Sequence, residues 1–345
     1  MAVRRRTIVI AASAVSAAAA LTVTSVLLSA GGGSRPDRPV ASATSTRPTP
    51  TPTLSDGPLV SPFTGERVKA LGPVLAVKID NVVDARPPTG LTDADIVYLL
   101  PVEGGLSRIF AVFSSHFPSV IGPVRSARED DIELLRQFGR PAFAYSGAQS
   151  YLLPIIEHAR TVDLYAGTTA GYFRDPNQII PHNLYANTSQ LLAQARGASN
   201  AHDIGFRFGP PPPGGRPTPS LSVAYPAASF SFRWSGRKTR WLVWMDGSPA
   251  LEAEGGQLSA ATVVIQYTRV RTSRFLEEGV PPPYAESTGA GTAVVLRNGL
   301  AYDAHWSRPQ ANGGTTFTTA AGQPMTFATG QVWIVLIAAP GSTSS

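Results

Sequence analysis

Cysteine is absent from all 345 residues of the chain. Its absence excludes disulfide bonds, thiol catalysis, cysteine-ligated metals and lipid attachment at a lipobox cysteine. Common enzyme signatures are missing as well: a G-x-S-x-G elbow, an H-E-x-x-H helix, a Walker A loop and a G-x-G-x-x-G turn after a strand. The five histidines show no paired metal spacing. We therefore predict no metal site and no cofactor, and whether the protein is an enzyme stays open.

Charged residues are also scarce, at 15% of the chain, and only three of them are lysines. The net charge of +6 is not concentrated in a folded region. Residues 1–60 carry six arginines and two aspartates, residues 61–200 carry 12 basic and 13 acidic residues, and residues 201–345 carry 11 basic and eight acidic residues. Because a nucleic-acid partner requires a strongly basic surface, no such partner is expected.

The N-terminus carries the clearest signal in the chain. MAVRRR is followed by an uncharged stretch over residues 7–30, which is long enough to cross a bilayer of about 30 Å. Arginines before the stretch predict that the N-terminal end stays in the cytoplasm. A signal peptide cleaved near Ala30 is the alternative. In either case we expect residues 31–345 outside the cytoplasm, tethered to the membrane by a single pass or secreted.

The rest of the chain divides by composition. Residues 31–59 are rich in Pro, Ser, Thr and Gly and predict an extended linker. Residues 60–206 mix strand and helix patterns and predict an α+β domain. Residues 207–220 form a Pro/Gly-rich connector. Residues 221–345 consist of short apolar runs between turn residues, which predicts a smaller all-β domain, a sandwich or a barrel.

Several elements can be placed within these domains. Residues 74–80 read as a buried strand. Two apolar runs around a two-residue Gly104-Gly105 turn predict a hairpin, with Glu103 opposite Leu106 and Arg108 on the same face as Glu103. Residues 126–138 read as a helix, with Ser126 and Glu129 forming a capping box. In the second domain, Asn298-Gly299 and Asp246-Gly247 predict tight hairpin turns. The tryptophans, all in this domain, are interpreted as packing residues.

A set of polar residues in the first domain is the candidate ligand-binding site. Several guanidinium groups could meet there around a phosphate or carboxylate, and Asp80, Glu103 or His182 could act as an acid or base. Each also has a structural interpretation: a turn at Asp80, an ion pair between Glu103 and Arg108, or a loop fixed by His182. The predicted site consists of Asp80, Asn81, Arg86, Glu103, Arg108, Arg125, Arg128, Asp131, His182 and Asn183.

The motifs VLAVKIDN, RPPTGL, ADIVY, VEGGLSRIFAVF, GPVRSARxxD and PHN occur in this order, and VVIQ, GAGTAVVLRNG and GQVWIVL follow. Together they resemble the YerB-like lipoproteins, a bacterial family of unknown function, over about residues 60–340. The resemblance implies an extracytoplasmic protein with two domains and no settled activity. Members of that family are typically anchored through a lipidated cysteine, whereas this chain has none.

Two functions follow from these patterns. The first is a membrane-tethered, extracytoplasmic binding or accessory protein of the bacterial cell envelope, whose partner is an anionic envelope polymer or a protein. The second is an envelope hydrolase or transferase that uses an Asp/Glu/His and arginine cleft. The hydrolase or transferase would require the polar residues to form a single pocket.

Overall fold

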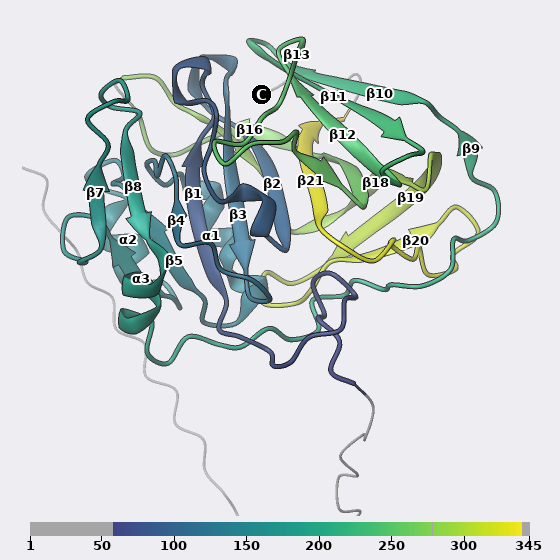
Figure 1. Cartoon of the computed structure of the whole chain (residues 1–345), viewed down its shortest axis with the longest axis horizontal. Helices are drawn as coiled ribbons and strands as arrows, with labels where there is room; N and C mark the ends of the chain where they lie inside the picture. Colours follow the sequence, from purple (N-terminus) through teal and green to yellow (C-terminus); the bar gives the residue numbers. More distant parts are fainter. Residues whose placement is uncertain (1–57, 278, 340–345) are drawn as a thin grey trace, which may run out of the picture. The chain divides into compact units, whose positions relative to one another are not determined.

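The computed structural model describes residues 58–277 and 279–339 (Figure 1). The hydrophobic segment predicted over residues 1–30 and nearly all of the linker predicted over residues 31–59 lie outside the described residues. Among the residues that are described, no helix is both long enough and apolar enough to span a bilayer.

A single 11-stranded sheet runs through both predicted domains. Its two halves join where β2 pairs in parallel with β21, with Ile96 opposite Val332 and Leu99 opposite Val335. The sheet has the order β20-β19-β18-β15-β21-β2-β3-β1-β5-β6, and β9 pairs with β19. Its strands are β1 Leu75–Asp80, β2 Ile96–Pro101, β3 Ser107–Phe113, β5 Ala142–Tyr145, β6 Val162–Tyr165, β9 Arg216–Pro217, β15 Thr262–Thr268, β18 Gly289–Arg297, β19 Leu300–Arg308, β20 Thr316–Thr319 and β21 Val332–Ala338.

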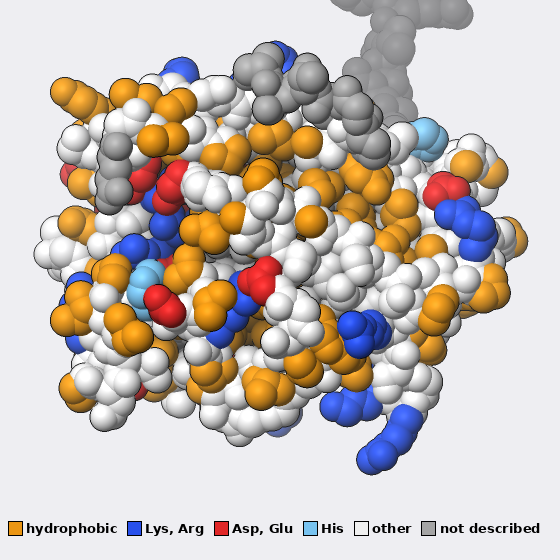
Figure 2. Space-filling view, turned by 90° about the horizontal axis from the view of Figure 1, so that it is seen from above, with side chains coloured by type: hydrophobic (Ala, Val, Ile, Leu, Met, Phe, Trp, Pro, Cys, Tyr) orange, Lys and Arg blue, Asp and Glu red, His pale blue; other side chains and the backbone are white. Residues whose placement is uncertain are grey.

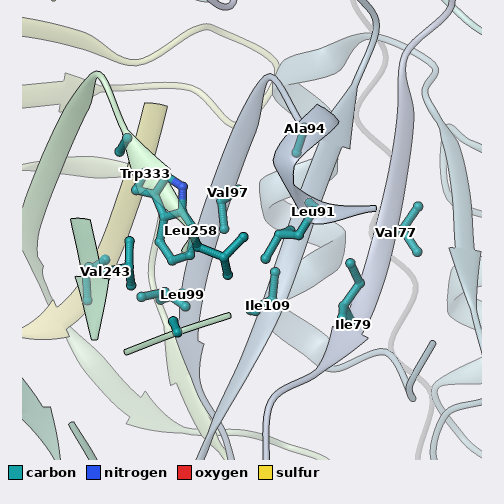
Figure 3. Packing of buried hydrophobic residues seen from close by; sticks show 14 of the residues in the cluster. Val77, Ile79, Leu91, Ala94, Val97, Leu99, Ile109, Val243, Leu258 and Trp333 are labelled. Atoms are coloured by element: carbon teal, nitrogen blue, oxygen red, sulfur yellow. The ribbon is translucent and has the colours of Figure 1, made fainter. Parts of the chain in front are cut away.

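The C-terminal region adds a second, five-stranded sheet that packs on one face of the long sheet. Trp241 and Val243 of this second sheet lie in one buried cluster with Leu99, Ile109 and Trp333 of the long sheet (Figure 3). This is face-to-face packing as in a sandwich, and the core is shared by the two regions. The second sheet consists of β10 Ser220–Tyr225, β11 Ala228–Ser235, β12 Arg240–Met245, β13 Ser248–Pro249 and β14 Ser259–Ala260.

Both predicted tight turns in this region are confirmed. Asn298 and Gly299 have φ values of 52° and 74° and connect β18 to β19. Asp246 and Gly247 have φ values of 50° and 79° and connect β12 to β13. Two consecutive residues with positive φ are the signature of the type I′ turn.

The predicted register of the N-terminal hairpin is wrong by one residue. Pro101 lies opposite Ser107, and Leu100 lies opposite Arg108. The reason is that the loop has three residues, Glu103–Gly105, in which both glycines adopt positive φ, so that Val102 donates to the Leu106 carbonyl at 3.0 Å. Strand β3 also pairs with β1 on its other side, where Arg108 lies directly opposite Asp80.

The helices are short: α1 Glu129–Leu135, α2 Leu153–Glu157 and α3 Thr188–Gln194, with 3-10 turns at Val83–Ala85, Leu91–Asp93, Glu103–Gly105 and Arg136–Phe138. The predicted start of α1 at Ser126 is wrong. Arg128 is the N-cap, and the Asp131 Oδ2 accepts from its backbone N at 2.7 Å. The preceding backbone is already bonded elsewhere, since Arg125 donates to the Lys78 carbonyl and Ala127 to that of Gly147.

Two small sheets complete the described fold. β4 Val120–Ile121, β8 Leu184–Asn187 and β7 Tyr172–Arg174 form one, and β16 Val270–Thr272 pairs with β17 Pro283–Ala285 in the other. The first places the loop that carries His182 beside the end of β1. The second carries Glu277 on its connecting loop.

Candidate functional site

The candidate site lies where β1 ends at Asp80, beside the β2–β3 turn (Figure 1). Asp80 is only 1% exposed. Its Oδ2 lies 2.7 Å from His182 Nδ1 and 3.0 Å from Arg125 Nε, and its Oδ1 accepts from the backbone of Asn81 at 2.9 Å. A carboxylate that bonds Nδ1 fixes the orientation of the imidazole and leaves Nε2 for another partner. Asp80 therefore positions two side chains that are both partly exposed.

Glu103 is the centre of a second group of charges next to the first. Arg128 donates to Glu103 through Nε at 3.0 Å and through a second, shorter bond from NH2, and Arg108 NH2 lies 3.2 Å from the same carboxylate. Burial acts to raise the pKa of Glu103, but the hydrogen bonds from Arg128 and the charge of Arg108 outweigh it and lower the pKa to about 2. Glu277 reaches Arg128 as well, at 3.2 Å.

Arg108 links the two groups. It lies opposite Asp80 in the sheet and pairs with Glu103. Burial, followed by the charge of Arg128, lowers the pKa of Arg108 to about 10, although the charges of Glu103 and Asp80 oppose this shift. Its Nε is buried and has no hydrogen-bond partner among the residues that the structure describes. A buried donor without a partner is uncommon in folded proteins and calls for an explanation such as a ligand.

Asp131 lies instead in a sealed ion pair. Its Oδ1 is 2.6 Å from Lys78 Nζ, and both side chains are 0% exposed. With its other oxygen capping α1, this carboxylate has no open face for a ligand, so its role is structural. Lys78 is absent from the predicted site, although a lysine in the otherwise apolar run VLAVK of a buried strand was a usable signal.

Three further predicted residues support the loops around the site. The Asn81 amide donates to Ser107 Oγ at 2.9 Å, and Arg86 binds the Asn81 carbonyl at 2.7 Å before turning away to Asp246 at 2.8 Å. The Asn183 side chain accepts from Arg174 at 2.6 Å and donates to the Asp175 carbonyl at 3.1 Å. Asn183 thereby closes the loop that carries His182.

The structure thus brings six predicted residues into one cluster, which we call the rim cluster: Asp80, Glu103, Arg108, Arg125, Arg128 and His182. Glu277 joins it, and sequence reasoning missed this residue because it comes from a distant loop with no motif of its own. Seen from above, Figure 2 shows acidic and basic side chains and a histidine close together on one side of this face, with hydrophobic side chains around them.

Comparison with known proteins explains why these motifs occur together. Two models of one family, described as protein of unknown function (DUF3048), match the chain: the N-terminal domain over residues 63–201 and the C-terminal domain over residues 221–334. The chain belongs to this YerB-like family. The resemblance noted from the motifs is therefore confirmed. The two matched regions share one sheet in the structure.

One curated relative and one solved structure belong to the same comparison. The chain is 43% identical over 81 residues to a Bacillus subtilis protein named "Putative lipoprotein YerB", and this match spans 24% of the length of each chain. The crystal structure of YerB protein from Bacillus subtilis superposes with a TM-score of 0.69 at 22% identity, covering 81% of this chain and 96% of that one. The latter similarity establishes a shared fold.

Proposed function

We propose that this protein is a membrane-tethered, extracytoplasmic binding protein of the bacterial cell envelope whose rim cluster takes an anionic group of its ligand. The observation that carries the proposal is the set of contacts that the Arg125 side chain makes and leaves open. Its Nε faces Asp80, its side chain is 25% exposed, and its terminal nitrogens make no hydrogen bond or ion pair within residues 58–277 and 279–339. A guanidinium group held at one edge presents its other edge to a phosphate or carboxylate in bidentate geometry.

The neighbours of Arg125 support the same role. Asp80 holds Arg125 and His182 on one carboxylate, so both are oriented before a ligand arrives. Preorganised donors lose little conformational freedom on binding. Buried Arg108 adds positive charge beneath them. Glu103 is already shared by Arg108 and Arg128, so it offers less competition to an anion at Arg125.

The cellular location in this proposal rests on the sequence and on the relative. Three arginines followed by an uncharged stretch predict an anchor or a signal peptide, and the curated relative is named a lipoprotein. Because this chain has no cysteine to acylate, the hydrophobic segment itself would serve as the tether. The linker would then hold the folded part at a distance from the membrane.

Isothermal titration calorimetry on the full-length chain tests the proposal, with inorganic phosphate, muropeptides and a poly(glycerol phosphate) chain as probes. Arg125→Gln should weaken binding of the anionic probe at least tenfold, since one charge-assisted hydrogen bond contributes about 1.5–3 kcal/mol. The matched control is Arg216→Gln, which removes an exposed arginine that pairs with Asp303. Equal affinities of the wild type and Arg125→Gln would refute the anion site.

A second candidate is an envelope hydrolase or transferase, and the Asp80–His182 pair favours it. A histidine held through Nδ1 by a buried aspartate is the arrangement of a general base. His182→Gln distinguishes the two functions, because it should leave anion binding within about threefold of wild type while lowering turnover at least ~100-fold. Mass spectrometry of products released from isolated cell walls measures that turnover. If the wild type releases no product, the enzymatic candidate is rejected.

A further inference from the structure

A second feature of the molecule is a cavity of about 710 Å³ beside α1 and α2, which no residue of the rim cluster is found to line among the described residues. Residues of α1 and α2 and of the segments that follow them line it, among them Ile132, Arg136, Pro154, Ile155, His158 and Arg160. None of the residues predicted to form a site from the sequence lines this cavity. Its size lies within the range of about 300–1,000 Å³ that is usual for small-molecule sites.

Positive charge in this cavity is not neutralised. Arg136 and Arg160 are exposed, and within the described ranges neither side chain makes a hydrogen bond or an ion pair. No carboxylate is among the described residues that line the cavity. Burial lowers the pKa of Arg308, and the positive charge of nearby Arg136 lowers it further. Arg136 therefore lies close to a buried like charge, an arrangement that an anion would relieve.

The carboxylates of α1 that could have neutralised these arginines are already bound. Glu129 accepts from Ser273 at 2.7 Å and from Arg274 at 2.7 Å. Glu133 accepts from Tyr284 at 2.9 Å and from the backbone of Ser287 at 2.7 Å and Thr288 at 2.8 Å. Neither carboxylate is therefore free to neutralise Arg136, which follows α1, or Arg160, which follows α2.

The remaining lining of the cavity is largely apolar. Ile132, Pro154 and Ile155 form one wall, and Ile155 is 42% exposed. Ile132, Ile155 and Arg136 also line an adjoining hollow of about 170 Å³ next to Glu129 and Glu133. His158 donates through Nδ1 to the Pro154 carbonyl at 2.7 Å, since a carbonyl only accepts. The imidazole is thereby fixed, with Nε2 unengaged by this bond.

We propose that this cavity binds a small amphipathic anion, with a phosphate or carboxylate between Arg136 and Arg160 and an apolar body on Ile132 and Ile155. The charge pattern selects the anionic end, because two arginines lie beside a cavity without carboxylates. The exposed isoleucine selects an apolar body, because covering apolar surface contributes about 25 cal/mol per Å². A fully polar anion would use the arginines and leave this wall exposed to water.

Calorimetry with the full-length chain tests the cavity directly. The probes are hexyl phosphate, hexanoate and inorganic phosphate, which separate the two anionic groups from each other and from the apolar body. Hexyl phosphate or hexanoate should bind at least tenfold more tightly than inorganic phosphate. The double variant Arg136→Gln/Arg160→Gln should lose at least tenfold in affinity for the hexyl probe, whereas Ile155→Ser should lose affinity for the hexyl probe and not for inorganic phosphate.

Two control variants make the result decisive. Arg237→Gln removes one exposed charge on the β11–β12 turn and should leave binding unchanged. Arg216→Gln, at an exposed arginine outside both sites, should also leave the affinity for the hexyl probe unchanged. Arg125→Gln tests the rim cluster and the double variant tests this cavity, so failure of one proposal and failure of the other are distinguishable. Absence of hexyl-probe binding up to millimolar concentration, or retention of affinity for that probe in the double variant, would each overturn the cavity site. Circular dichroism verifies that every variant is folded.

Discussion

Strand β1 carries two charged side chains on the same face, two residues apart, and they have opposite surroundings. Lys78 is paired with Asp131 at 2.6 Å, and neither side chain is exposed. Asp80 is equally buried, but its partners Arg125 and His182 are 25% and 16% exposed. The Lys78–Asp131 pair is fully buried beneath α1. Asp80 lies at the end of the strand, where its two partners reach the surface.

The contrast separates structural charge from charge that is available to a ligand. In the sealed pair, the short Lys78–Asp131 contact neutralises both charges and water has no access, so its contribution is to the fold. In the rim cluster, Asp80 uses its oxygens to hold side chains whose other atoms reach the surface. A burial criterion alone would have grouped Asp131 with Asp80. The exposure of the partners distinguishes them.

Breaking the sealed pair should have the largest effect. Asp131→Asn leaves the Lys78 ammonium buried without a counterion, and we expect a loss of about 3–5 kcal/mol in the free energy of unfolding. Urea denaturation of the full-length chain measures it. The double variant Lys78→Met/Asp131→Leu removes both charges and should be more stable than the single variant. A single-variant loss below about 1 kcal/mol would mean that the pair is not sealed.

Glu103 should give a smaller effect that depends on pH. Because the folded-state pKa is lowered to about 2, the stabilisation is fully present above the ordinary carboxyl pKa near 4.3 and is lost as pH falls through 4 towards 2. We expect Glu103→Gln to lower the free energy of unfolding by about 1.5–3 kcal/mol at pH 7. The difference from wild type should shrink at pH 3, where urea titrations at both pH values would reveal it. If the stability difference between wild type and Glu103→Gln is the same at both pH values, the Glu103 carboxylate is not the source of the pH dependence.

The pKa of Asp130, the residue next to Asp131, shifts in the opposite direction to that of Glu103. Burial, together with the negative charge of Asp131, raises the pKa of Asp130, although Lys78 opposes the shift. Its Oδ1 is buried, without a hydrogen-bond partner in the described part of the chain. A raised folded-state pKa means that the fold is favoured by protonation and disfavoured as pH rises. Asp130→Asn should therefore stabilise the protein by about 1 kcal/mol at pH 8 and by less at pH 5.

The comparison of Asp130→Asn with Asp131→Asn is a matched test, because two adjacent buried aspartates undergo the same isosteric change. Thermal unfolding at pH 8 should give shifts of opposite direction for the two variants. If both variants are destabilised equally, the distinction between a paired and an unpaired carboxylate does not hold.

Local patterns predicted the elements whose partners are close in sequence. Asn298-Gly299 and Asp246-Gly247 specify their turns by positive φ alone, so the hairpins followed directly. The start of α1 was mispredicted because Ser126 and Glu129 satisfy the same spacing rule as Arg128 and Asp131. Backbone bonds to residues distant in sequence decide between them, from Arg125 to the Lys78 carbonyl and from Ala127 to the Gly147 carbonyl.

The site was predictable in its members and less so in its geometry. Asp80 and Asn81 at a strand end, and the arginines before a helix, were recognisable from residue type and position. The contact between Asp80 and His182 joins residues separated by 102 positions. Glu277 arrives from a loop of the C-terminal region. No periodicity or spacing encodes such contacts, since they depend on how the two regions share one sheet.

Within the rim cluster, Arg128 and Arg125 should differ in the same way, and Arg125 should have the smaller effect on stability. Arg128 is 4% exposed and makes two hydrogen bonds to Glu103, so Arg128→Gln should lower the free energy of unfolding by about 1.5–3 kcal/mol. Arg125 makes one partly exposed ion pair, and Asp80 retains its bonds to His182 and Asn81 without it. Arg125→Gln should therefore lower stability by less than about 1 kcal/mol. Urea denaturation of both variants, beside the binding measured for Arg125→Gln, tests whether the open arginine is held for a ligand: a large stability loss on Arg125→Gln would assign it to the fold instead.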